Sequence, residues 1–150
     1  MQELKSKVIA YYRQQVQDKE DAFRDMIAAL TEGAANDAKG SAGDKHETAL
    51  SMMHLEQEKL NAKLAEILAQ KAILNRIDSN TQSSKIILGS LVKANSMLLF
   101  LCAALPKITV DGQTVIALSP QSPLGSKLLG MQEGDSFTVG NVSYTIEVVC

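Results

Sequence analysis

The chain has few of the residues on which disulfide-bonded and membrane-spanning proteins depend. Its 150 residues include two cysteines, three prolines and no tryptophan. Cys102 and Cys150 form no CxxC motif and no disulfide framework, which favours a reducing cytoplasm. The longest apolar run, 97–105, is about half of what spans a bilayer as a helix, and the amino terminus lacks the features of a secretory signal. The sequence therefore predicts a soluble, cytoplasmic protein that does not enter a membrane.

An excess of charge of one sign is also missing. The chain has 15 basic and 17 acidic residues, and its formal net charge of -2 gives no overall attraction for nucleic acid. Residues 1–78 hold 11 of the basic and 13 of the acidic side chains. A hydrophobic content of 45% is ordinary for a globular protein with a core, which argues against disorder throughout.

The first half of the chain has the pattern of two amphipathic helices. Neither glycine nor proline interrupts residues 4–30 or 44–76, and apolar residues recur in alternating steps of three and four. The positions predicted to form the first seam are Ile9, Tyr12, Val16, Lys19, Phe23, Met26 and Leu30. Those of the second seam are Leu50, Met53, Gln57, Leu60, Leu64, Ile67, Lys71 and Leu74. Two seams of similar length predict an antiparallel coiled-coil hairpin, in which the polar seam residues help to fix the register.

The segment 32–43 is predicted to turn the chain between these helices. It is small or polar, and Gly33, Gly40 and Gly43 can adopt the positive φ that ends or reverses a helix. The polar stretch 78–85 then interrupts the helical periodicity. We therefore predict two domains, a hairpin over residues 1–78 and a second domain over 79–150.

The second half has the composition of a small β-rich domain. Its predicted strands are 86–92, 97–105, 114–118, 136–139 and 143–149. Asp111-Gly112 and Gly140-Asn141 are typical hairpin turns. Ser122 can cap a short helix that begins at Pro123, and Gly130 can close it. The predicted fold class is α+β, with a mostly antiparallel sheet and one short helix after the helical hairpin.

Two stretches of sequence match the motifs of a known family. Residues 118–135, LSPQSPLGSKLLGMQEGD, contain Ser-x-x-Ser-Pro-hydrophobic-Gly, then Leu-Leu-Gly, then Gly-Asp. At the predicted turn, Gly43, Asp44, Glu47 and Ala49 match part of a second pattern, Gly-Asp-x-x-Glu-Asn-Ala-Glu-Tyr. Over nearly all of its length the chain resembles the bacterial Gre transcript-cleavage factors. This resemblance implies a coiled-coil hairpin followed by a domain of FK506-binding-protein-like (FKBP-like) fold.

The same resemblance implies a role inside another enzyme. Asp44 and Glu47 are expected to enter the secondary channel of RNA polymerase and to help hold a second Mg²⁺ near the 3′ end of the nascent RNA. Mg²⁺ is commonly held by one or two carboxylates together with phosphate and water, so two acids suffice for a shared site. A second metal ion activates water for attack on the RNA phosphodiester. The chain is then a monomeric accessory factor without a catalytic centre or cofactor of its own, and its second domain docks at the channel rim.

The residues at the turn also allow other interpretations. From spacing alone, Asp44 and Glu47 form a capping box at the start of a helix. Thr48, Leu50 and Ser51 depart from the family pattern, which leaves open a regulator that occupies the same channel without cleavage. A coiled-coil adaptor unrelated to transcription is a more remote alternative.

Two enzymatic interpretations are disfavoured by the composition. A thiol nucleophile would be Cys102 or Cys150, but Cys102 lies in an apolar run with no base nearby in sequence. A proline isomerase, suggested only by the implied fold, needs an aromatic-lined pocket. The second half offers Phe100, Phe137 and Tyr144 as its only aromatic residues.

Overall fold

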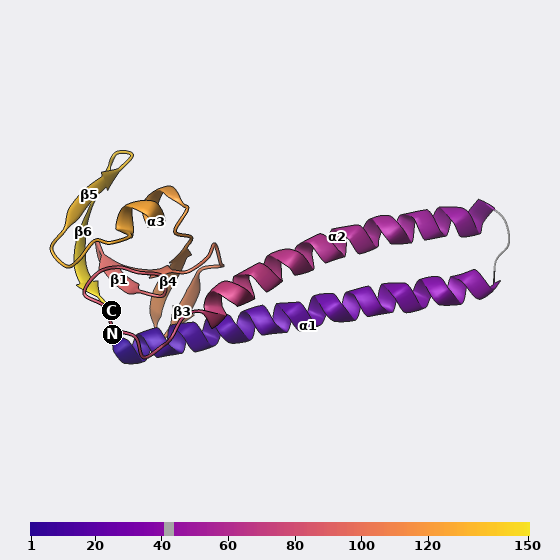
Figure 1. The fold of residues 1–150 in the computed structure, drawn as a ribbon, viewed down its shortest axis with the longest axis horizontal. Coiled ribbons are helices and arrows are strands. Elements are labelled where there is room, and N and C mark those ends of the chain that lie inside the picture. Colours follow the sequence, from indigo (N-terminus) through magenta and orange to yellow (C-terminus); the bar gives the residue numbers. More distant parts are fainter. Residues whose placement is uncertain (41–43) are drawn as a thin grey trace. The chain divides into compact units, whose positions relative to one another are not determined.

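Two long helices, a six-stranded sheet and one short helix make up the fold, which confirms the predicted α+β class (Figure 1). The structure, a computed structural model, describes the chain apart from residues 41–43, and its side chains apart from residues 34–46. Two compact units are present. Unit 1 comprises Met1–Arg13 and Ala72–Cys150, and unit 2 comprises Gln14–Lys71. Whether residues 1–78 and 79–150 fold as separate domains stays a prediction.

The two predicted helices are α1, Gln2–Gly40, and α2, Asp44–Asn75. Helix α1 is longer than expected, because it continues through Gly33 instead of ending near it. A glycine inside a helix costs only about 1 kcal/mol relative to alanine. The sequence around Gly33 includes three alanines between positions 34 and 38, and alanine is the best helix former. Among the described residues, no helix is both long and apolar enough to cross a membrane.

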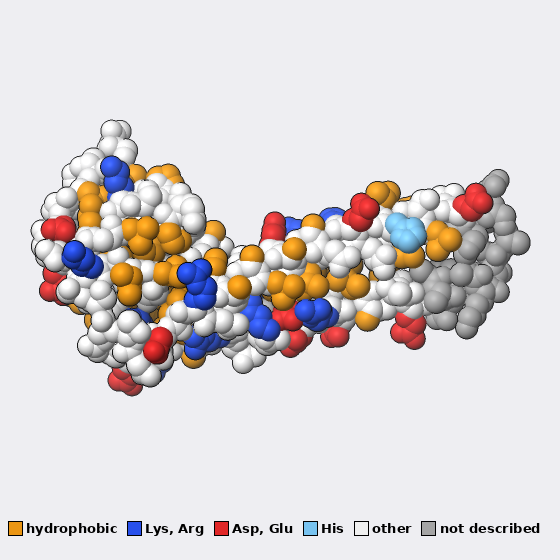
Figure 2. All heavy atoms as spheres, viewed as in Figure 1, with side chains coloured by type: hydrophobic (Ala, Val, Ile, Leu, Met, Phe, Trp, Pro, Cys, Tyr) orange, Lys and Arg blue, Asp and Glu red, His pale blue; other side chains and the backbone are white. Residues whose placement is uncertain are grey.

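The seam of unit 2 agrees with the prediction on α2 and differs from it on α1. All predicted α2 positions from Leu50 to Lys71 are buried or half-buried. On α1 the buried residue is instead Glu20, while Lys19 and Ile27 are half-buried and Met26 is 50% exposed. Lys19 and Glu20 both continue a pattern of steps of three and four residues, so periodicity alone could not decide which of them lies in the seam. On the face seen in Figure 2, hydrophobic side chains run between the two helices of this unit.

The sheet belongs to unit 1. Its strands are β1 Leu91–Ala94, β2 Met97–Leu101, β3 Ile108–Val110, β4 Gln113–Leu118, β5 Ser136–Val139 and β6 Val142–Val149. They lie in the order β3-β4-β2-β1-β6-β5. All neighbours are antiparallel except β2 and β4, which are parallel. The sheet is therefore mostly antiparallel, as predicted, with one parallel pair that the sequence did not indicate.

Several strand boundaries differ from those predicted. β1 begins at Leu91, because the backbone of Ile86 is instead bonded to the segment that follows the short helix, at Gly130 and Met131. β2 ends at Leu101, and β3 was not predicted. The β1–β2 turn was missed because Asn95 and Ser96 adopt positive φ, of 50° and 62°, without a glycine. The predicted turns at 111–112 and 140–141 do join consecutive strands.

The core of unit 1 joins the sheet to the short helix α3, Pro123–Leu128. One cluster of buried side chains consists of Ile86, Val92, Ala94, Leu99, Leu101, Leu128 and Ile146. The first turns of α1 add a second apolar surface, in which Tyr12 is fully buried. Its ring stacks on Phe100 with centroids 6.0 Å apart, and its hydroxyl donates a hydrogen bond to the carbonyl oxygen of Pro106 at 2.6 Å.

Candidate functional site

The predicted acidic pair lies in the first turn of α2. Asp44 is the first residue of this helix, and its side chain lies outside the described residues. Glu47, three residues later, is exposed. The positive end of the helix dipole favours an acidic residue there, so the capping interpretation keeps a physical basis. In the described part of the site, Glu47 supplies one solvent-accessible carboxylate.

Glu47 lies far from the other end of unit 2. It precedes Lys71 by 24 residues of continuous helix, which is about 36 Å at a rise of about 1.5 Å per residue. Among the described side chains, no three from His, Cys, Asp and Glu gather into a set that could hold a metal ion. Glu47 can supply a hard oxygen ligand of the kind Mg²⁺ prefers, but an ion bound to it needs further ligands.

The three residues that depart from the family pattern have different surroundings. Thr48 and Ser51 are exposed on α2. Leu50 is half-buried and occupies the first position of the α2 seam. A leucine at this position supplies no further acid near the turn.

The motif at 118–135 builds local structure around α3. Ser122 has the extended conformation of an N-cap, and its Oγ accepts a hydrogen bond from the backbone N–H of Gly125 at 3.0 Å. The same hydroxyl donates to the carbonyl oxygen of Ser119 at 2.7 Å. Pro123 occupies the first turn, where no N–H is needed. Gly130, at a φ of +82°, follows the helix. These contacts confirm the predicted cap and show why the motif has serine, proline and glycine at these places.

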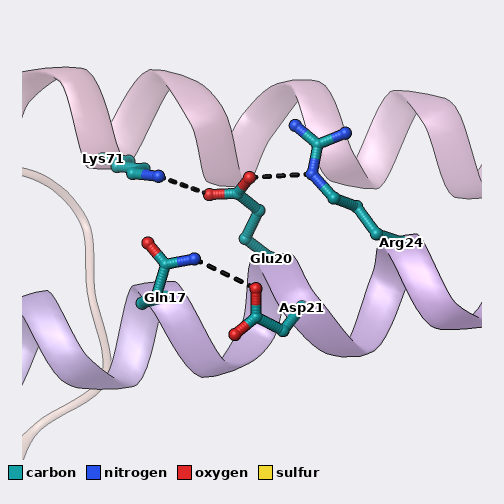
Figure 3. Close-up of polar contacts among 5 residues, drawn as sticks. All are labelled: Gln17, Glu20, Asp21, Arg24 and Lys71. Atoms are coloured by element: carbon teal, nitrogen blue, oxygen red, sulfur yellow. Dashed lines mark hydrogen bonds and ion pairs between the residues drawn. The ribbon is translucent and has the colours of Figure 1, made fainter.

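A charged cluster in the seam of unit 2 was missed by the sequence prediction. The Glu20 side chain is only 9% exposed, and its Oε1 lies 2.7 Å from Lys71 Nζ on α2. Its Oε2 lies 2.8 Å from Arg24 Nε on α1. Figure 3 shows both cations converging on this carboxylate, beside the hydrogen bond between Gln17 and Asp21. The hydrogen bond from Lys71, and then that from Arg24, lower the pKa of the Glu20 carboxyl.

One sequence signal could have located this cluster. Lys71 is a predicted seam residue, and a buried ammonium requires an acid facing it. On α1, Asp18 and Glu20 both flank the predicted seam residue Lys19, and Arg24 follows Glu20 one turn later. Considering charge as well as hydrophobic period would have indicated an acid beside Lys19 as the partner of Lys71, without deciding which one.

The structure also describes the groups considered for enzymatic chemistry. Cys102 is fully buried, as predicted, and burial raises the pKa of its thiol to about 11. A thiol of that pKa supplies little thiolate at neutral pH. An open cavity of about 340 Å³ in unit 1 has no aromatic lining and is bordered by Lys93, Ser96, Met97, Leu98, Gln113, Thr114 and Ile116. It lacks the aromatic wall that a proline-binding pocket would need.

Comparisons with known proteins give a likeness to solved structures only. No protein-family model and no curated protein matches the chain. Among solved structures, the transcription factor Gfh1 is similar at 18% identity, over 91% of this chain and 92% of that chain, with a TM-score of 0.35. At this identity and TM-score the likeness does not establish a shared function. The function proposed below therefore rests on the residues of the chain and on its fold.

Proposed function

We propose that the chain is a Gre-type accessory factor that acts within the secondary channel of RNA polymerase and promotes cleavage of backtracked transcripts. The observation that carries this proposal is the exposed Glu47 in the first turn of α2, beside the turn of a two-helix hairpin. It is supported by the motif at 118–135, whose serine, proline and glycine residues resemble those of the Gre family and build α3.

The proposed role of the chain is to position carboxylates. Helix pairing stiffens α2, and about 36 Å of helix separates Glu47 from the other end of unit 2. A carboxylate at such a place can reach a metal centre in a partner while the other end of unit 2 stays outside it. A second Mg²⁺, when bound there, would activate water for attack on the phosphodiester. Because Mg²⁺ takes about six oxygen ligands, its remaining ligands would come from polymerase, RNA and water.

A transcript-cleavage assay tests this proposal. Polymerase stalled on a backtracked transcript is mixed with wild type, Asp44→Asn or Glu47→Gln, and the short 3′ fragments are counted. We expect at least about tenfold fewer fragments with either variant, because an amide is a poorer ligand for Mg²⁺ than a carboxylate. Glu58→Gln is the matched control, because Glu58 is an exposed acid on the same helix. Full cleavage by Glu47→Gln would contradict the proposal.

The same assay addresses the non-cleaving alternative. Thr48, Leu50 and Ser51 differ from the family pattern, and Leu50 is half-buried. A regulator without cleavage activity would bind polymerase and change transcript synthesis, yet wild type would release no 3′ fragments. Failure of wild type to bind core polymerase in a pull-down would instead favour an adaptor unrelated to transcription.

A further inference from the structure

Glu20 and Lys71 place a charged contact inside an otherwise mainly apolar seam. The residue Glu20 is 7% exposed, and Lys71 is half-buried. Both oxygens of the carboxylate have a cationic partner, one from each helix (Figure 3). The seam continues on either side of Glu20 with Val16 and Phe23. The contact is therefore a charged layer with apolar residues on both sides.

Stability alone does not account for such a layer. Replacing a buried ion pair by apolar residues of similar volume is often neutral or stabilising, whereas removing one partner is strongly destabilising. Leucine at both positions would continue the seam, as it does at Leu60 and Leu64. The best-attested use of a polar group at a seam position is to specify register and pairing.

We propose that Glu20 and Lys71 select the alignment in which α1 and α2 pair, by penalising the alternatives that an apolar seam would allow. A slip of seven residues leaves the hydrophobic repeat in phase. It would, however, move the carboxylate and the ammonium about 10 Å apart along the helix axis. In one direction Leu64 would take the place of Lys71, and Glu20 would face an apolar side chain.

Self-association is penalised in the same way. If two copies of α1 paired in parallel and in register, Glu20 would face Glu20, and two copies of α2 would bring Lys71 against Lys71. Like charges that face each other in a seam are unfavourable, and of the native contacts Glu20 would keep only the one with Arg24 of its own helix. A second contact supports the native alignment, since Gln57 Nε2 donates to Thr31 Oγ1 across the helices at 2.9 Å. A slip would break this bond together with the ion pair.

The test is to replace Glu20 and Lys71 by apolar residues and to measure how α1 and α2 are then aligned. The full chain carries Glu20→Leu with Lys71→Leu, together with Cys150→Ser so that only introduced cysteines are labelled. The buried thiol of Cys102 stays unlabelled in the folded chain. Nitroxide labels are placed at exposed Ala22 on α1 and Ser51 on α2, and their separation is measured by double electron–electron resonance. Light scattering gives the oligomeric state of the same samples.

We expect wild type to give one distance and one monomeric species, with alternative states below about one molecule in a hundred. In the double leucine variant, a distance shifted by several Å or a dimer should reach at least about one molecule in ten, a roughly tenfold rise. The control instead removes one exposed charge from each helix, with Asp25→Ala and Lys63→Ala, and should behave as wild type. Helix content by circular dichroism verifies that each variant is folded.

One result would overturn the inference. If the double leucine variant keeps a single distance and stays monomeric, the turn and the ends of the helices suffice to set the alignment. Should that variant precipitate, Glu20→Gln with Lys71→Gln keeps a polar seam without charges and is measured in the same way. For that variant too, a single label distance with a monomeric state would overturn the inference, and a shifted distance or a dimer would support it. None of these outcomes depends on activity with polymerase, so the inference stands or fails separately from the proposed function.

Discussion

Removing the hydroxyl of Tyr12 tests how the start of α1 is held in unit 1. The side chain is fully buried, and its hydroxyl donates to the carbonyl oxygen of Pro106 at 2.6 Å. The ring lies nearly parallel to that of Phe100, at an angle of 8°. Tyr12→Phe removes the donor and keeps the ring, so it changes the hydrogen bond without opening a cavity of the size that Tyr12→Ala would leave.

The expected loss follows from that single contact. A neutral hydrogen bond contributes about 1 kcal/mol net to the free energy of unfolding. Stacking and burial of the ring are retained, so we expect Tyr12→Phe to be about 1 kcal/mol less stable than wild type. Truncation to alanine would also remove the ring and should cost about 4 kcal/mol.

Urea unfolding followed by circular dichroism measures the difference. For a small protein, a loss of about 1 kcal/mol lowers the urea midpoint by about 0.5 M. The matched control is Tyr11→Phe, because Tyr11 precedes Tyr12 on the helix but is 47% exposed. That control should lie within about 0.5 kcal/mol of wild type. If Tyr12→Phe is as stable as the control, the bond to Pro106 contributes nothing, and ring packing alone holds this part of α1.

Three further predictions concern the caps, turns and charges. Ser122→Ala should lower the stability of unit 1 by about 1 kcal/mol in urea unfolding, and Ser122→Thr should restore most of it, because threonine keeps a hydroxyl that can accept the capping bond and donate to the carbonyl oxygen of Ser119. Gly89→Ala should cost about 2 kcal/mol or more, since Gly89 has a φ of +92° and a methyl group there would lie 2.7 Å from Cγ2 of Ile77; an unchanged midpoint would refute this. The lowered pKa of Glu20 means that its contacts with Lys71 stabilise the folded state above the ordinary value of 4.5 and that this contribution is lost as pH falls below it. Thermal unfolding of Glu20→Gln should therefore lose less stability on acidification than wild type, and parallel curves would contradict that reasoning.

The sequence by itself determined the kinds of element and much of their order. Uninterrupted periods of three and four gave two long helices, and Ser122, Pro123 and Gly130 located the short one, because capping and turn preferences act over a few residues. The turns at 111–112 and 140–141 followed from glycine next to aspartate or asparagine in the same way. Placing Glu47 near the turn of the hairpin likewise required only the positions at which helical periodicity stops.

Only the tertiary structure decided which residues meet. Glu20 and Lys19 fit the α1 pattern equally well, and the choice depends on Lys71, 51 residues away in the chain. The parallel pairing of β2 with β4 and the short strand β3 depend on contacts across the sheet that no local pattern encodes. The physical reason is the same in each case. Backbone preference is a property of neighbouring residues, whereas the burial of a charge or the pairing of a strand is settled by the partner that packing brings to it.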